Sequence, residues 1–439
     1  MENFFFTARN IFDYLAPLNK IAGKDLTGKN LLDDDEVQGL FLEIIKSQID
    51  SDNWLTMPIS DAVNTGLQGV KLDFNLGFRL EVPAGNWHAK ISDFDSGEIV
   101  FDKDISDVRL HSLESYYINW HVELFLDGEK VFAHTFDAEG KVVLIYFPRI
   151  GIGDILAMLP YAEEFRRRNK CQVFVIMRND LREIAAYLYP ELLQTNQILI
   201  NVNYATYRMT MPANIVPIWP ADVRIYPLGR IAEIALGVQK LSNKPRFEPT
   251  MPPVTNDPYV CISIQASAVR KGWFYPNGWD IVVNYLKSLG YRVFCIDRDA
   301  ECKDDKLDLV NRKPDGAEDF TGNFSLLERA NMIYYADFFI GLSSGLAWIA
   351  NTVNCPVVMI CGFSQNWSEF YTPYRVANRL VCNGCFNDIR YNYIVDTCPR
   401  HKGTPREFEC QKKISPRQVI DAIERLIIDE HLTPPILRN

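Results

Sequence analysis

The sequence lacks any hydrophobic run near the roughly 20 residues that a transmembrane helix requires. Residues 1–6 contain no basic region ahead of a short apolar stretch, so no secretory signal is expected. Basic residues are also in deficit: 46 Lys and Arg face 56 Asp and Glu, for a formal net charge of −10. This balance disfavours a broad nucleic-acid-binding surface. We therefore expect a cytoplasmic protein that binds neither membranes nor nucleic acid.

The composition is that of a folded protein with more than one domain. Of the 439 residues, 47% are hydrophobic and 23% are charged, which excludes wholesale disorder. A length of about 150 residues per domain suggests two or three domains. The ten cysteines are expected to be thiols or metal ligands, because disulfides are rare in a reducing compartment.

Hydrophobic periodicity divides the chain into four parts. Residues 1–65 predict a helical N-terminal extension, and residues 66–140 alternate in the way of a small antiparallel β domain. Asp127-Gly128 lies between two alternating runs and predicts a hairpin turn. Residues 141–245 and 258–439 each alternate apolar strands with helices, which is typical of two α/β domains. Residues 241–258, rich in proline, form the linker between them.

Near-continuous apolar runs in the two α/β parts predict parallel strands that are covered on both faces. These runs are residues 141–147, 171–176, 259–264, 291–296, 338–342 and 357–360. In folds of this class, ligands bind in a cleft at the carboxyl ends of the strands. Ser415-Pro416 predicts the start of a C-terminal helix, with Ser as the cap and Pro in the first turn.

Two glycine-containing loops each follow a buried strand and precede a helix. In the first, Gly151 and Gly153 permit a sharp turn and a close ligand, and Asp154 faces the cleft from the helix start. The alternative for Asp154 is simple helix capping. In the second, residues 343–346 read Ser-Ser-Gly-Leu, and the free amides of a helix start suit a diphosphate. Here the alternative is a serine cap, and without a Walker lysine pattern nucleotide hydrolysis is not suggested.

A basic loop follows the first strand of the second α/β domain. Ser267 and Lys271 lie in it, and a hydroxyl and an ammonium at a strand end can bind phosphate oxygens. A solvent-exposed loop lysine is the alternative.

Four cysteines near the C-terminus have the spacing of a metal site. Cys382, Cys385, Cys398 and Cys410 follow the pattern C-x2-C-x12-C-x11-C, and four thiolates can surround one tetrahedral ion. Such a site leaves no open coordination position, so its role would be structural. The chemistry fits zinc, and four sulfur ligands also suit iron. Four unrelated core thiols are the alternative.

Together these motifs resemble the bacterial autotransporter heptosyltransferases, which modify adhesins and share their glycosyltransferase core with the lipopolysaccharide heptosyltransferases. The resemblance covers about residues 66–420 and also rests on the segments 204–208, 316–322 and 369–373. It implies a GT-B fold of two Rossmann-like domains, with an N-terminal antiparallel β domain and a C-terminal four-cysteine metal knot at residues 382–410. The lipopolysaccharide enzymes carry Asp-Thr-Gly and a histidine where this chain has Ser343-Ser344-Gly345 and Ala347-Trp348, which favours a protein acceptor.

The resemblance implies an inverting protein O-heptosyltransferase. Its donor would be ADP-heptose, its acceptors Ser or Thr hydroxyls of an autotransporter passenger domain, and its catalytic base Asp154. Iron, as Fe³⁺, would occupy the four cysteines; no catalytic divalent metal is expected, and the assembly would be a large ring such as a dodecamer. The substrate-binding positions would be Gly151, Gly153, Thr206, Tyr207, Arg208, Ser267, Lys271, Asp319, Ser343, Ser344, Gly345 and Leu346. Alternative functions are a non-catalytic nucleotide-sugar-binding scaffold and a lipopolysaccharide-type heptosyltransferase.

Overall fold

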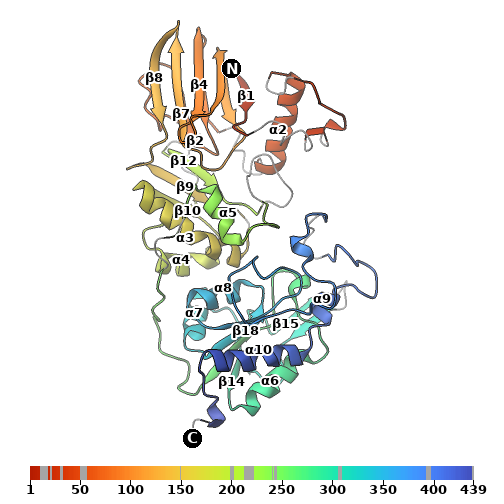
Figure 1. The fold of residues 1–439 in the computed structure, drawn as a ribbon. Coiled ribbons are helices and arrows are strands. Elements are labelled where there is room, and N and C mark those ends of the chain that lie inside the picture. Colours follow the sequence, from red (N-terminus) through yellow and green to blue (C-terminus); the bar gives the residue numbers. More distant parts are fainter. Residues whose placement is uncertain are drawn as a thin grey trace.

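The computed structural model describes residues 1–9, 18–19, 22–29, 33–49, 57–148, 150–197, 202–211, 222–239, 241, 245–304, 309–391 and 397–437. In Figure 1 an antiparallel sheet lies at one end of the molecule, and two α/β lobes follow it in chain order. Within the described residues, no helix has the length and apolar character needed to cross a lipid bilayer.

The first lobe is built on an eight-stranded sheet in the order β1-β6-β3-β2-β12-β9-β10-β11. Its strands are β1 (Glu2–Phe6), β2 (Lys71–Asn75), β3 (Arg79–Val82), β6 (Val108–Ser112), β9 (Val142–Tyr146), β10 (Gln172–Ile176), β11 (Leu193–Gln194) and β12 (Ala205–Arg208). The strands from β2 to β11 in this order pair in parallel, whereas β3 pairs antiparallel with β2 and with β6. The centre of β9 is buried, as its continuous apolar run predicts.

This sheet crosses the boundary that the sequence placed at residue 140. β2 pairs with β12, so β2, β3 and β6 extend the sheet of the first lobe. Polar residues explain the difference: Asp73 and Arg79 suggest solvent-facing positions, yet both are buried and form an ion pair with an Nη2–Oδ2 distance of 2.6 Å. Because buried charged residues are paired in this way, the alternation of polar and apolar residues does not reveal that the strand is covered on both faces.

Residues 1–65 also differ from the helical extension that was expected. Residues 2–6 form strand β1, which pairs in parallel with β6 at the edge of the sheet. Three consecutive phenylalanines, Phe4 to Phe6, favour a strand over a helix here. The expected helix is present as α2 (Asp35–Ile49), which has Asp35 and Glu36 in its first turn.

The expected antiparallel sheet is present as a separate four-stranded sheet in the order β5-β4-β7-β8. Its strands are β4 (Trp87–Asp93), β5 (Ile99–Ile105), β7 (Trp120–Leu126) and β8 (Glu129–Thr135). The β7–β8 hairpin turns at Asp127-Gly128, whose φ angles of 51° and 85° are those of a type I′ turn. The hairpin that this dipeptide predicts is confirmed.

The second lobe contains a six-stranded parallel sheet in the order β17-β14-β13-β18-β19-β20. Its strands are β13 (Tyr259–Ser263), β14 (Arg292–Cys295), β17 (Glu318–Asp319), β18 (Phe338–Leu342), β19 (Val357–Ile360) and β20 (Arg375–Val376). The four apolar runs that predict strands in this lobe are therefore confirmed. A two-stranded hairpin, β15 (Glu301–Asp304) and β16 (Leu309–Arg312), lies outside this sheet.

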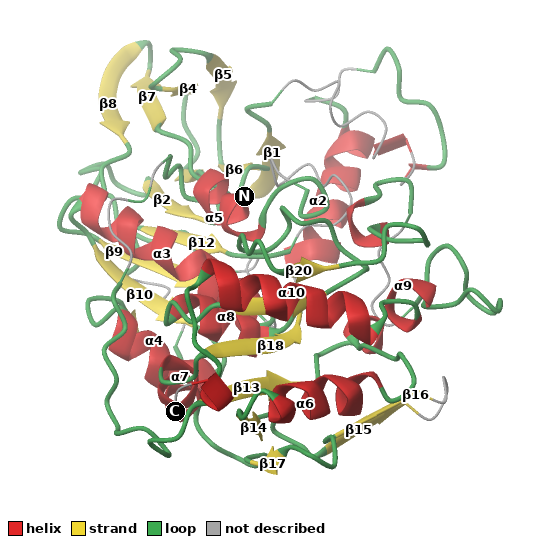
Figure 2. Cartoon of the chain, turned by 60° about the horizontal axis from the view of Figure 1, so that its bottom comes forward, coloured by secondary structure: helices red, strands yellow, loops and turns green. Residues whose placement is uncertain are grey.

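Helices cover both sheets and bring the lobes together. They are α3 (Ile152–Asn169), α4 (Arg182–Leu188) and α5 (Leu228–Ala235) in the first lobe, and α6 (Gly278–Ser288), α7 (Leu326–Tyr334), α8 (Gly345–Thr352), α9 (Glu409–Lys412) and α10 (Pro416–Asp429) in the second. Ser415 caps α10, and its hydroxyl accepts a hydrogen bond from the Gln418 amide. α3 packs on α8, so the lobes meet at the starts of these two helices (Figure 2).

Candidate active site and metal site

Asp154 stands in the first turn of α3, directly after the loop that follows β9. The backbone N–H of Gly151, the N-cap residue, donates a hydrogen bond to Asp154 Oδ2 at 2.9 Å. Asp154 thus caps the helix from the N3 position, whereas the N-cap position considered for it belongs to Gly151. This hydrogen bond uses Oδ2 and fixes the orientation of the carboxylate.

Two glycines let the helix starts of the lobes touch. A Cβ atom at Gly153 would lie 2.4 Å from Trp348 Cδ1 of α8. A Cβ atom at Gly345 would lie 2.8 Å from the Ile152 Cβ of α3. Both distances are far below van der Waals contact, so these positions need glycine for close approach. The sequence predicts that Gly153 makes room for a ligand, whereas in the structure the other lobe fills this room.

The charge environment of Asp154 comes from both lobes. Burial raises the pKa of Asp154, while the positive charge of Lys271 and the hydrogen bond from Gly151 lower this pKa. Glu369 raises it again through its own negative charge. Lys271 and Glu369 belong to the second lobe, so the carboxylate of Asp154 lies at the boundary where the two lobes meet.

The Ser-Ser-Gly-Leu loop lies between β18 and α8, as expected. Ser344 is the N-cap residue of α8, but its hydroxyl is buried, caps nothing and has no hydrogen-bond partner among the described residues. The first amides of this helix and an unpartnered hydroxyl suit an anion. Gly345 and Leu346 open the helix and are partly buried.

Ser343 turns away from that anion position. Its hydroxyl donates to Glu369 Oε1 at 2.6 Å, and Glu369 pairs with Arg375 at an Nη1–Oε2 distance of 2.9 Å. The ion pair is almost wholly buried, with 5% and 6% of the two side chains exposed. The buried Glu369–Arg375 pair thus holds the Ser-Ser-Gly-Leu loop in place through Ser343. In the sequence the segment 369–373 supports the resemblance only, because a buried ion pair leaves no periodic signal that would reveal its role.

Lys271 ends a short 3-10 helix, Val269–Lys271, in the loop after β13. Its side chain is partly buried, and Nζ lies 5.8 Å from the centroid of the Phe363 ring. Ser267, in the same loop, is exposed. The structure therefore brings together Lys271 from the loop after β13, Ser344 from the start of α8 and Asp154 from the first turn of α3.

The other expected substrate-binding residues lie on the strands β12 and β17. Thr206 and Tyr207 are buried in the first lobe, where Thr206 bonds Asn75 and Tyr207 packs on Phe165, so their side chains serve the lobe interior. Arg208 ends β12 beside Tyr146 of β9. Asp319 is exposed on β17 and accepts hydrogen bonds from the amide and hydroxyl of Thr321.

An Asp-x-Asp triplet at the end of β14, residues 297–299, was missed in the sequence. Its first carboxylate is directed into the sheet, where Asp297 accepts hydrogen bonds from the Ser263 hydroxyl and from the amides of Ile264 and Gln265. Burial raises the pKa of Asp297 to about 6 despite these bonds. This carboxylate therefore orders the loop that leads to Lys271.

The four cysteines of the expected metal site are brought together. The thiol of Cys410 interacts electrostatically with those of Cys385, Cys398 and Cys382 and also with that of Cys361, which lies outside the expected set. Cys398 and Cys410 are buried. All nine cysteines with described side chains are free thiols. The four thiols thus lie in one region, but among the described residues no three of their sulfur atoms are within 4.8 Å of one another, so the four-cysteine site stays a prediction.

The surroundings of the cluster suit a cation bound by thiolates. Burial, with Cys398 and Cys382, raises the pKa of Cys385 to about 11, so ionised sulfurs need a positive charge beside them. Arg400 donates to Cys382 Sγ at 3.5 Å. Cys382, His401 and Glu409 also offer ligand atoms within 4.8 Å of one another. The four-cysteine spacing in the sequence does not reveal His401 or Glu409 as possible ligands.

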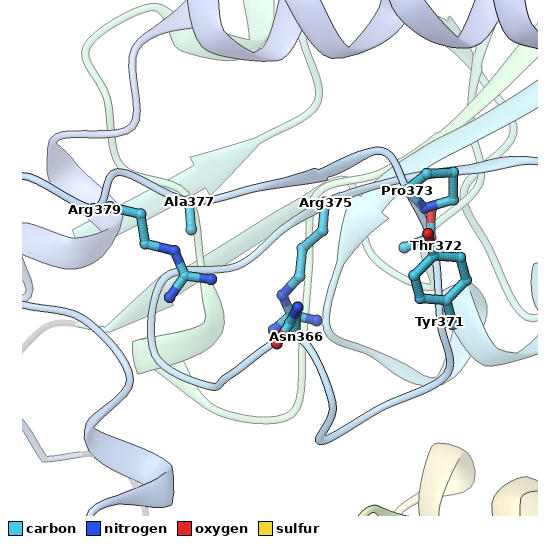
Figure 3. A pocket seen from close by; sticks show the side chains of 7 residues that line it. All are labelled: Asn366, Tyr371, Thr372, Pro373, Arg375, Ala377 and Arg379. Atoms are coloured by element: carbon cyan, nitrogen blue, oxygen red, sulfur yellow. The ribbon is translucent and has the colours of Figure 1, made fainter.

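A cavity of about 250 Å³ lies at the edge strand β20 of the second lobe (Figure 3). Arg379 and Tyr371 lie at its two ends, and Arg375 lies between them. Arg375 is already paired with Glu369, and Arg379 donates to the amide oxygens of Gln365 and Asn383. The wall of this cavity is therefore continuous with the ion pair below the Ser-Ser-Gly-Leu loop.

Known proteins resemble this chain over most of its length. The family model for the glycosyltransferase TibC N-terminal domain matches residues 66–128, and that for glycosyltransferase family 9 (heptosyltransferase) matches residues 232–392. The autotransporter heptosyltransferase BAHTCr of Citrobacter rodentium is 40% identical over 369 residues, which are 82% of this chain and 90% of that protein. The chain belongs to the autotransporter heptosyltransferase family. It is thus a glycosyltransferase of family 9 with the GT-B arrangement of two α/β lobes.

Two further members of the family are informative. The structure of a dodecameric iron-containing heptosyltransferase, TibC, in complex with ADP-D-beta-D-heptose has a TM-score of 0.78 and 39% identity, and the match covers 83% of this chain and 97% of that one. BimC of Burkholderia thailandensis, described as an inactive autotransporter heptosyltransferase, is 34% identical over 81% of this chain and 85% of its own length. Family membership alone therefore does not decide whether a member transfers sugar.

Substitution of Gly153 by Ala tests the contact between the lobes. The new methyl group would collide with Trp348 and push α3 from α8, and a displacement near 1 Å can cost about 10²-fold in rate. We expect glycosyl transfer to fall by about that factor while the melting temperature changes little. Gly39→Ala is the matched control, because a Cβ at this exposed position of α2 meets nothing within 4 Å. Equal activity of the two variants would contradict the assigned contact.

Proposed function

We propose that this protein is an inverting O-heptosyltransferase that transfers heptose from ADP-heptose to Ser or Thr hydroxyls of an autotransporter passenger domain. One observation carries the proposal: a fixed carboxylate of the first lobe, Asp154, lies within electrostatic reach of Lys271 of the second. The donor class follows from the ADP-heptose bound to the TibC relative, and the acceptor class follows from the names of the autotransporter heptosyltransferases.

In the proposed reaction, the acceptor hydroxyl oxygen attacks the anomeric carbon from the side opposite the diphosphate. The new C–O bond forms as the bond to the diphosphate oxygen breaks, the configuration inverts, and ADP leaves with the electron pair. The hydroxyl proton moves to Asp154. Lys271 and the amides at the start of α8 stabilise the charge that grows on the leaving diphosphate, which is where binding energy lowers the barrier.

These groups supply positive charge to the diphosphate from the protein itself, so the proposal needs no catalytic divalent metal. The four cysteines are proposed to hold a structural iron ion, since the TibC relative is an iron-containing protein. Zinc is the alternative for the same sulfur donors. A large ring of subunits, a dodecamer as in that relative, and a cytoplasmic location are proposed as well. Free thiols throughout the described cysteines fit a reducing compartment.

A second candidate function is favoured by the description of BimC as inactive: a scaffold that binds a nucleotide sugar without transferring it. The capping hydrogen bond of Asp154 would serve either function, whereas the Lys271 charge beside this carboxylate favours the transferase.

Intact-mass measurement of a co-expressed autotransporter passenger domain tests the transfer reaction. We expect a ladder of increments, each of one heptose residue, that vanishes with Asp154→Asn. General-base catalysis contributes about 10²–10⁴-fold, so this variant should keep donor binding and lose nearly all turnover. Increments of one hexose would show that the donor carries a hexose. A passenger domain that stays unmodified while the protein binds ADP-heptose would favour the scaffold function.

The pH profile tests the role of Asp154. Because burial raises its pKa and the base works ionised, kcat/KM should fall as pH falls, around a midpoint above that of an ordinary aspartate. Lys271→Met removes a charge that lowers this pKa, so the acid limb should move to higher pH, whereas Lys271→Arg should leave it nearly unchanged. Identical acid limbs in the two variants would disprove the electrostatic contact.

Elemental analysis tests the metal site. We expect about one iron per chain, lost in Cys398→Ser together with part of the thermal stability, because metal binding contributes to folding. Cys171→Ser is the control, since this buried thiol lies in the first lobe, away from the cluster. Well-folded protein without iron or zinc would refute the site, and zinc alone would replace iron in the proposal.

A further inference from the structure

Gln411 connects the cysteine cluster to the loop that carries Lys271. It follows Cys410 directly and is fully buried. Its side chain spans two loops: Oε1 accepts from the Gly362 amide at 3.1 Å, and Nε2 donates to the Arg270 carbonyl at 2.8 Å. Its own carbonyl accepts from the Phe274 amide at 3.2 Å. The segment 270–274, which contains Lys271, is thus bonded at both ends to a single residue.

Packing around this residue leaves little freedom. A Cβ atom at Gly362 would lie 2.3 Å from the Cys410 carbonyl oxygen, so the backbones of the two segments touch. Trp273, nearly fully buried, donates from Nε1 to the Ile414 carbonyl at 2.8 Å. The chain on both sides of Lys271 therefore takes its position from residues 410–414, where the last cysteine lies.

The same cysteine segment is also bonded to the first lobe. Arg224 donates from Nη1 to the carbonyls of Ile389 and Tyr391, each at 3.1 Å, and its own carbonyl accepts from Asn387 Nδ2 at 2.9 Å. Asp222 pairs with Arg224, and both are buried. A buried charged group held in this way fixes direction as well as distance.

We propose that the four-cysteine segment is the element that positions Lys271 opposite Asp154, with Gln411 as the positioning residue for the lysine loop and Arg224 as the one for the first lobe. The inference deepens the proposed function and rests on it. A bound metal would stiffen the backbone next to Cys410, and Gln411 would pass that stiffness to the donor phosphate site.

The test uses the full chain with its metal and takes ADP as the probe. Gln411→Leu keeps the size of the side chain and removes both of its hydrogen bonds, and Lys413→Ala is the matched control at an exposed position of the same segment. We expect Gln411→Leu to retain its iron, to bind ADP about tenfold more weakly by calorimetry, and to exchange the amide hydrogens of residues 266–274 faster. KM for the donor should rise with a smaller change in kcat.

Arg224→Lys supplies the complementary pattern. Lysine keeps the charge beside Asp222, but its single nitrogen cannot replace both the Nε and Nη2 bonds to Asp222 and the Nη1 bonds to the two carbonyls. We expect unchanged ADP affinity and a kcat lowered by about 10²-fold, because the lobes then lose their alignment.

Three results would overturn the inference. Gln411→Leu could show wild-type ADP affinity and wild-type amide exchange, or it could lose ADP affinity only in preparations that have also lost iron. The third such result is a wild-type kcat in Arg224→Lys. If Gln411→Leu does not fold, chelation of the metal from the wild-type protein gives the same readout, and unchanged exchange of residues 266–274 would again overturn it. A wild-type protein that binds ADP but transfers no heptose would contradict the proposed function alone, since affinity and exchange still decide the inference.

Discussion

The proposed reacting groups of this protein come from two lobes, and their geometry depends on the contact between the first turns of α3 and α8. Gly153 meets Trp348 there, and Gly345 meets Ile152, at distances that no larger residue permits. This contact determines where Asp154 stands relative to the helix start at Ser344. Glycine at these two positions thus allows the two lobes to approach each other closely. The contact between the lobes also determines the width of the gap in which a ligand would bind.

The same contact creates an electrostatic conflict at Asp154. Taking its carboxylate out of water raises its pKa, and the neighbouring Glu369 acts in the same direction. Lys271 and the Gly151 amide act against burial and favour the charged form. A carboxylate that is ionised but poorly solvated is a stronger base than one in water. The buried pairing of Glu369 with Arg375 limits the negative charge that would otherwise work against the leaving diphosphate.

Much of the fold could be predicted from the sequence because strands such as β9, β13 and β18 are apolar on both faces, and because Asp127-Gly128 and Ser415-Pro416 have specific local chemistry. Where polar residues are buried in pairs, the same reasoning failed: Asp73 and Arg79 hid the membership of β2 and β3 in the sheet of the first lobe. In the candidate site, Asp154, Lys271 and the loop at Ser344 could be predicted because each follows a strand. Glu369 and Gln411 could not, because their roles arise only from contacts between distant segments.

Gln411 illustrates why a structural cluster can affect chemistry without touching substrate. A loop lysine is a long, flexible side chain, and its electrostatic effect on a diphosphate depends on where its backbone is held. Between Cys410 and Lys271, Gln411 reaches Gly362 on one side and Arg270 on the other, so two strand ends share one buried amide. Arg224 joins the same segment to the opposite lobe. Residues 387–391 and 410–411, which are described parts of this segment, therefore contact both lobes. Under the proposed function, these contacts set the distance between the Lys271 ammonium and the Asp154 carboxylate.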